Sequence, residues 1–130
     1  MCIRDRINTN GKIVITQPVV ERRVISTHAA QLLTGMLSQA AQFGSAILAQ
    51  VPGYSIAAKT GTATTQGISA NQTEASVAGF IPASNPHFVI LVKIDRPQKA
   101  IYGSTAAAPL WKTIAQQLMW YYAVPPDNAQ

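Results

Sequence analysis

The sequence predicts an α+β fold in which three antiparallel strands are flanked by helices. Apolar residues recur at helical spacing over about residues 27–42 and again over about residues 107–122. Three strand-like segments lie between these two predicted helices. The segments are joined by polar or turn-forming loops, and this favours antiparallel pairing, because parallel strands need a longer crossover.

Composition limits the class of protein. The 130 residues are 48% hydrophobic and 12% charged, as in a folded protein of at most one domain. The formal charge of +5 is spread along the chain, with only Arg22 and Arg23 adjacent, so nucleic-acid binding is not expected. The single cysteine, Cys2, excludes an internal disulfide and a cysteine-based metal site. No apolar run approaches the ~18 residues of a membrane span.

The first segments give the expected boundaries. Residues 1–6 show no pattern that leads into the rest of the chain, and we interpret them as an artefactual or foreign start. Residues 8–11 are a turn signal, and residues 12–16 are a short β segment. We expect a partial domain over residues 7–126 and a tail over residues 127–130.

The first predicted helix follows a favourable N-cap, Ser26, and ends near Gly44. Its apolar stripe predicts the side of the helix that is buried. The stripe consists of Leu32, Leu33, Met36, Leu37, Ala40 and Ala41.

The next stretch, residues 54–63, reads as a strand that carries one lysine among small residues. Alternate side chains share a face of a strand, so Lys59, Gly61 and Ala63 point one way and Thr60 and Thr62 the other. A cation among small residues is costly to bury unless an anionic or polar group meets it. Gly61 lets a ligand lie flat against the strand. The pattern therefore predicts a strand that receives an extended, peptide-like ligand with a carboxylate.

Two further strands and a helix complete the pattern. Residues 74–81 form the second predicted strand, and residues 87–95 form the third, whose apolar residues on both faces predict a central position in the sheet. Pro109 fits the first turn of the last helix, where a missing N–H costs nothing. The predicted apolar stripe of this helix is Leu110, Ile114, Leu118 and Tyr121.

The run Lys59-Thr60-Gly61 matches the third motif of the penicillin-binding proteins and serine β-lactamases. With Pro52-Gly53-Tyr54 before it and Thr62-Ala63 after it, the stretch most resembles the class B penicillin-binding proteins. The resemblance implies the C-terminal half of a serine β-lactamase/penicillin-binding-protein-like transpeptidase domain, whose complete sheet has five strands. The third strand would then lack its neighbour, so we expect poor solubility of the chain alone.

By this resemblance, Lys59 and Thr60 are catalytic-site residues, and Thr60, Gly61 and Thr62 bind substrate. The backbone N–H of Thr62 supplies half of an oxyanion hole. The nucleophilic Ser and its Lys partner come from an S-x-x-K motif, and no Ser here has Lys three residues later. Ser69-Ala70-Asn71 fits the family's S-x-N motif only in letters, because it follows the K-T-G strand instead of preceding it. We therefore expect the chain alone to be inactive.

The resemblance also implies what the intact protein does. It would be a peptidoglycan D,D-transpeptidase that cross-links stem peptides by serine acyl transfer and is acylated by β-lactams. It would use no cofactor or metal, lie on the extracytoplasmic side of the cell membrane and meet divisome membrane proteins. The run from Tyr102 to Pro109 favours a division enzyme over an elongation enzyme.

Other interpretations remain open from the residues alone. The chain could belong to a β-lactamase or a sensor-type penicillin-recognising domain, or it could be a non-catalytic peptide-binding module. A Ser–His–Asp triad that uses His87 and Asp95 can be written down, but no nucleophile elbow accompanies it. Neither His28 nor His87 has a carboxylate or Cys at metal-ligand spacing.

Overall fold

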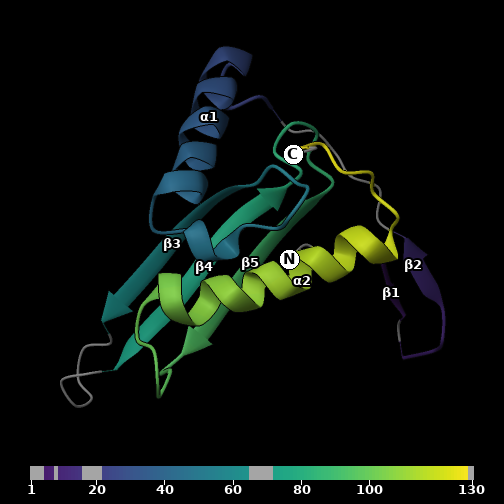
Figure 1. Ribbon diagram of the computed structural model, residues 1–130. Coiled ribbons are helices and arrows are strands. Elements are labelled where there is room, and N and C mark those ends of the chain that lie inside the picture. Colours follow the sequence, from purple (N-terminus) through teal and green to yellow (C-terminus); the bar gives the residue numbers. More distant parts are fainter. Residues whose placement is uncertain (1–4, 8, 16–21, 65–71, 129–130) are drawn as a thin grey trace.

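The computed structural model describes residues 5–7, 9–15, 22–64 and 72–128. Figure 1 shows a three-stranded sheet crossed on one side by a long helix, α2, with a second helix, α1, standing at one edge of the sheet. The order of the main elements is helix, three strands, helix, as the sequence predicts. The α+β fold class is therefore confirmed.

The sheet is an antiparallel meander. Its strands are β3 (Ala57–Thr64), β4 (Thr73–Ile81) and β5 (Phe88–Asp95), in the order β3-β4-β5. The register places Lys59 opposite Ala78 on β4, and Gly61 opposite Ser76. The motif strand β3 is thus paired on one side only, within the described residues.

The third strand is not central. Among the described residues, β5 pairs with β4 alone and forms the second edge of the sheet. The side chains of Ile90 and Val92 are buried, but Val89 and Leu91 on the opposite face are 83% and 68% exposed. The prediction of burial on both faces was wrong for this chain, because nothing in the described residues covers the second face.

Helix α1 (Thr27–Phe43) begins where the sequence predicts. The Ser26 side chain accepts a hydrogen bond from the backbone N–H of Ala29 at 3.1 Å and so caps the helix. The predicted stripe, however, is largely exposed: Met36 is 65% exposed, and only Ala41 is buried. The helical spacing was correct, but the surface that this stripe would pack against is absent from the described residues. A short 3₁₀ helix, η1 (Ile47–Ala49), follows.

Helix α2 (Ala108–Tyr121) follows a five-residue π-helical turn, η2 (Gly103–Ala107). The predicted stripe is only half correct: Ile114 and Leu118 are partly buried against the core, but Leu110 is 46% and Tyr121 82% exposed. The buried residues of α2 are Ala108, Trp111, Ala115 and Met119. The rest of the prediction failed because it followed the aliphatic residues, whereas the helix faces the sheet with one large aromatic ring between small residues.

The core lies between α2 and the sheet. Val77 and Val92, which are paired across β4 and β5, are buried under the helix. Trp111 fills the space above them, and its indole Nε1 donates a hydrogen bond to the backbone oxygen of Ile90 at 3.0 Å. A buried indole N–H needs such a partner. The sheet therefore has one face under α2 and one face that remains open.

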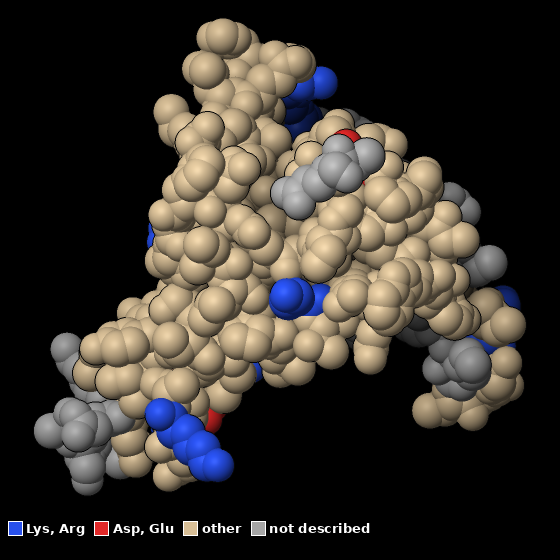
Figure 2. All heavy atoms as spheres, in the orientation of Figure 1, with Lys and Arg blue, Asp and Glu red and all other residues tan. Residues whose placement is uncertain are grey.

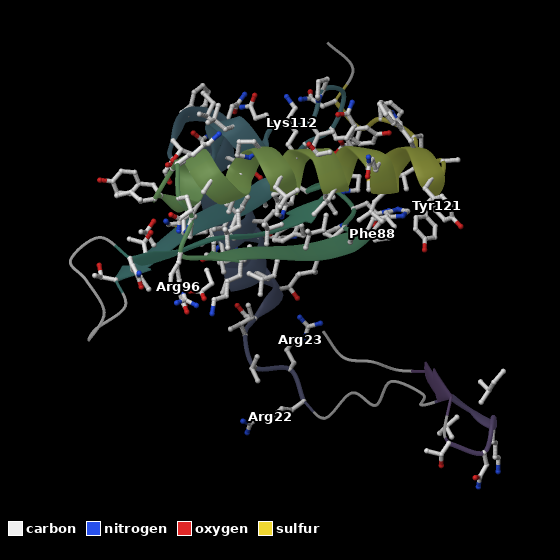
Figure 3. All side chains as sticks on the ribbon, turned by 90° about the horizontal axis from the view of Figure 1, so that it is seen from below. Arg22, Arg23, Phe88, Arg96, Lys112 and Tyr121 are labelled. Carbon is white, nitrogen blue, oxygen red and sulfur yellow. The ribbon has the colours of Figure 1, made fainter. Side chains whose placement is uncertain are left out.

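The N-terminal hairpin consists of β1 (Asp5–Ile7) and β2 (Ile13–Ile15), which pair antiparallel. It stands away from the sheet in Figure 3. The β segment expected near residues 12–16 is therefore present, while the expected boundaries after residues 6 and 126 stay predictions. Within the described part of the chain, no helix is long and apolar enough to cross a membrane.

Candidate functional site

The candidate site is the edge strand β3, and its two faces differ. Thr60 pairs with buried Val77 and Thr62 with buried Ala75, so both threonines lie on the same face of the sheet as α2, where Thr60 is half-buried and Thr62 is exposed. Lys59 and Gly61 point to the open face, as alternation along the strand predicts. The motif thus places its cation and its glycine on the same accessible side of the sheet.

The Lys59 side chain is exposed, and its Nζ donates a hydrogen bond to the backbone oxygen of Thr60 at 2.8 Å. Two ion pairs lie elsewhere in the described residues: Lys93 with Glu74, and Arg96 with Asp95. The ammonium of Lys59 therefore meets a neutral oxygen and no carboxylate in this part of the chain. Such a cation at an open strand edge can bind an anionic group.

The two threonine hydroxyls are held by neighbours that the sequence did not predict. Thr60 Oγ1 and Ser45 Oγ lie 2.7 Å apart and share a hydrogen bond. Thr62 Oγ1 accepts a hydrogen bond from the backbone N–H of Gly103 at 3.1 Å. Because Thr62 acts there as the acceptor, that bond leaves its hydroxyl proton available to a ligand. Ser45 lies in the turn after α1, and Gly103 begins the turn before α2, so the site depends on both helices.

Gly61 is required by packing as well as by any ligand. A Cβ built at Gly61 would lie 2.7 Å from Ser76 Oγ, and a Cβ at Gly103 would lie 2.5 Å from the backbone oxygen of Gly61. Both distances are too short for a side chain. The sequence argument for Gly61 considered only clearance for a ligand and missed the Ser76 side chain beside it and the close approach of Gly103 to the Gly61 backbone.

A carboxylate, Asp127, lies near the start of β3. Its Oδ1 accepts a hydrogen bond from the backbone N–H of Ser55 at 2.7 Å, and its Oδ2 accepts from the hydroxyls of Ser55 and Ser84. Partial burial by itself would raise the pKa of Asp127, but the hydrogen bonds from Ser55 and Ser84 outweigh it and hold the pKa below its ordinary value. Asp127 falls in the predicted tail, and no local sequence pattern links it to Ser55, 72 residues away.

The other candidates are not brought together. His87 precedes β5 and Asp95 ends it, so an eight-residue strand separates them, and the triad written from these residues is not formed. His28 lies in the first turn of α1, and Ser69-Ala70-Asn71 lies outside the described residues. No cluster of three His, Cys, Asp or Glu side chains that could hold a metal occurs within the described ranges.

Charged side chains are sparse on the side of the molecule where α2 lies. On the face shown in Figure 2, Lys and Arg side chains are scattered singly over a mostly uncharged surface. A cavity of about 340 Å³ lies between the end of α1, the residues that precede β3, and α2. Lys59, Thr60, Gly61 and Thr62 do not line this cavity. The candidate site is therefore the unpaired edge of β3, which α1 contacts in part, and not this cavity.

Comparisons with known proteins agree on one family. Residues 2–118 match the family model of the penicillin-binding protein transpeptidase domain. The chain is 34% identical over 114 residues to peptidoglycan D,D-transpeptidase FtsI of Buchnera aphidicola subsp. Baizongia pistaciae, covering 84% of this chain and 20% of that protein. It is 33% identical over 118 residues to FtsI of Escherichia coli K12, covering 87% of this chain and 20% of that protein. The chain therefore spans about a fifth of the length of these curated relatives.

Solved structures give the same result. The transpeptidase domain of penicillin-binding protein 3 from Burkholderia pseudomallei superposes with a TM-score of 0.78 at 30% identity, covering 87% of this chain and 36% of that one. Penicillin-binding protein 3 from Mycobacterium tuberculosis, complexed with ampicillin, gives 0.77 at 30% identity, covering 98% of this chain and 31% of that one. The predicted family is therefore confirmed, and this chain belongs to the penicillin-binding protein transpeptidase domain family, of which it forms a part.

Proposed function

We propose that the longer protein containing this chain is a peptidoglycan D,D-transpeptidase of cell division. The observation that carries the proposal is the Lys59-Thr60-Gly61 motif on an edge strand whose Lys59 and Gly61 share the open face of the sheet. An open strand edge can receive an extended peptide alongside it. The stem peptide of peptidoglycan would be that ligand, with its terminal carboxylate near the hydroxyls of Thr60 and Thr62.

Each motif residue has a role in this proposal. Lys59 supplies positive charge and hydrogen bonds to the catalytic centre. Thr62 donates its hydroxyl proton to the ligand, since the bond from Gly103 uses it only as an acceptor. The backbone N–H of Thr62 is one donor of the oxyanion hole, and Gly61 keeps the strand flat beside it.

The reaction is acyl transfer from a serine that lies outside this chain. That serine attacks the carbonyl of the D-Ala–D-Ala bond, D-Ala leaves with a proton, and an acyl-enzyme forms. The amine of a second stem peptide then attacks the ester, releases the serine and forms the cross-link. Because this chain supplies one wall of the site and no nucleophile, we propose that it is inactive alone.

The proposed setting follows from the substrate. Peptidoglycan is assembled outside the cytoplasmic membrane, so the intact protein would act on that side, held at the membrane and in contact with divisome membrane proteins. β-Lactams would acylate the same serine. No cofactor is proposed, because acyl transfer of this kind needs only a nucleophile, a base and oxyanion donors.

A fluorescent penicillin tests the function. The complete protein should be labelled covalently, and this chain alone should stay unlabelled. Lys59→Gln in the complete protein should slow labelling by about 10²-fold, the typical cost of one lost stabilising donor. Lys93→Gln is the matched control, since Lys93 is an exposed lysine on β5 that pairs with Glu74. Equal labelling of the Lys59→Gln and Lys93→Gln proteins would contradict the assigned role, and an unlabelled wild-type protein would contradict the function.

A further inference from the structure

The residues that lead into the motif strand are bound by the C-terminal segment, Val124–Asn128, which we call the clasp. The Tyr54 hydroxyl donates a hydrogen bond to the backbone oxygen of Val124 at 2.7 Å. In the other direction, the backbone N–H of Asn128 donates to the backbone oxygen of Gly53 at 3.2 Å. The backbone at both ends of the clasp therefore contacts two consecutive residues, Gly53 and Tyr54, which lie shortly before β3.

Gly53 and Pro126 form the middle of this contact. Gly53 has a φ of +82°, in the left-handed region that a residue with a side chain rarely adopts. A Cβ at Gly53 would lie 3.5 Å from Pro126 Cβ, an ordinary van der Waals distance, so Pro126 lies beside Gly53 and it is the backbone conformation that favours glycine. The Pro52-Gly53-Tyr54 run thus has a structural role of its own, which is to form the surface that the clasp covers.

Asp127 connects the clasp to two other segments. Its carboxylate binds the backbone N–H and hydroxyl of Ser55 and the hydroxyl of Ser84, which lies between β4 and β5. The hydroxyl oxygen of Ser55, Oγ, in turn accepts a hydrogen bond from the backbone N–H of Ala83 at 3.0 Å. One charged group thereby joins the entry to β3, the turn after β4 and the C-terminal segment. Hydrogen bonds to a charged acceptor are about twice as strong as those between neutral groups.

Contacts of this kind matter for the motif strand β3 because it is paired on one side only within the described residues. Within the described residues, β3 has a backbone ladder to β4 only, so its outer side relies on contacts other than strand pairing. Ser55 precedes Lys59 by four residues, or roughly 13 Å of extended chain. A shift of Ser55 would therefore also shift Lys59 and its neighbours along the same stretch of chain. Small displacements of catalytic groups lower the reaction rate strongly.

We propose that the clasp positions Lys59-Thr60-Gly61 for acylation, and that Asp127 is the positioning residue through which it acts. The proposal rests on the proposed function, because acylation is the reaction that it would affect. Asp127 itself touches neither substrate nor the reacting atoms. Its effect is carried by Ser55 along β3.

The test uses the complete transpeptidase that contains this chain, with two measurements on each variant. The first is the rate of acylation by a fluorescent penicillin, and the second is amide hydrogen exchange of β3 compared with β5. Asp127→Asn should slow acylation roughly three- to tenfold, as expected for weakened hydrogen bonds to a partly exposed carboxylate. It should speed exchange in β3 and leave β5 unchanged. Asp95→Asn is the matched control, because Asp95 is an exposed carboxylate that pairs with Arg96 at the far end of β5.

A second variant separates positioning from general stabilisation. Ser55→Ala should slow acylation in the same way, and the Asp127→Asn/Ser55→Ala protein should be no slower than the slower single variant, since both changes break the same contact. Wild-type acylation by Asp127→Asn would overturn the clasp proposal while leaving the proposed function intact. Equal loss of exchange protection in β3 and β5 would also overturn it, because that is the behaviour of a residue that only stabilises the fold. A wild-type protein that takes no label would overturn both proposals.

Discussion

Gly103, at the start of η2, lies against the backbone of Gly61 on β3. A Cβ at Gly103 would lie 2.5 Å from the Gly61 oxygen and 3.2 Å from its nitrogen. The Gly103 N–H also donates to Thr62 Oγ1, so the turn before α2 touches two consecutive motif residues. This contact ties the geometry of the site to the start of the last helix.

Gly103→Ala should destabilise the chain by about 1–3 kcal/mol, because the added methyl group forces β3 and η2 apart. Urea unfolding measures the change. Gly35→Ala is the control: Gly35 lies within α1, and a Cβ there meets nothing within 4 Å. The control should gain about 0.5–1 kcal/mol from better helix propensity. A neutral Gly103→Ala would mean that the turn and the strand are less tightly packed than described.

Trp111→Phe should cost about 1–3 kcal/mol, since it removes volume from the core and leaves the Ile90 oxygen without its indole donor. Trp120→Phe is the control, because Trp120 lies on the same helix but is exposed. It should change stability by less than about 0.5 kcal/mol. Thermal unfolding of the two variants side by side gives the comparison. Similar losses in both would show that Trp111 is not the central core residue.

The hydrogen bonds to Asp127 predict how stability depends on pH. The pKa of Asp127 is lowered in the folded state from its ordinary value of 3.8, so the ionised form is favoured by folding. Its contribution is therefore fully present above that ordinary value and is lost as the pH falls through the lower, folded-state pKa. Asp127→Asn should be less stable than wild type near neutral pH, and the difference should shrink in acid. A difference that stays constant on acidification would contradict this assignment.

The open face of β5 predicts association of the isolated chain. Val89 and Leu91 are exposed on β5, whose second edge is unpaired within the described residues and is a template for pairing with another copy. Leu91→Lys should reduce the apparent mass in sedimentation, because charge on an edge strand opposes such pairing. Leu110→Lys, an exposed leucine on α2, serves as the control for added charge alone. If both variants sediment alike, the edge of β5 is not the contact.

The sequence predicted what depends on neighbours along the chain. The helix start at Ser26, the three strands and their antiparallel order follow from caps, periodicity and loop length, and the structure has them all. The faces of Lys59 and Thr60 follow from strand alternation alone. These features need no knowledge of what packs against what.

The sequence did not predict what depends on contacts between distant segments. Met36 and Leu91 looked like core residues because they are apolar and correctly spaced, but the surfaces that would bury them are not among the described residues. The bonds from Asp127 to Ser55 and from Gly103 to Thr62 join segments 72 and 41 residues apart. No local pattern indicates them, and they decide how the motif strand is held.

The strand order β3-β4-β5 puts the proposed peptide-binding strand and the strand that can extend the sheet at opposite edges. In the proposed function the peptide binds along β3, whereas a further strand can pair with β5, two strand spacings or roughly 10 Å away. A strand added at β5 therefore leaves β3 accessible, and a peptide bound along β3 does not prevent a strand from pairing with β5.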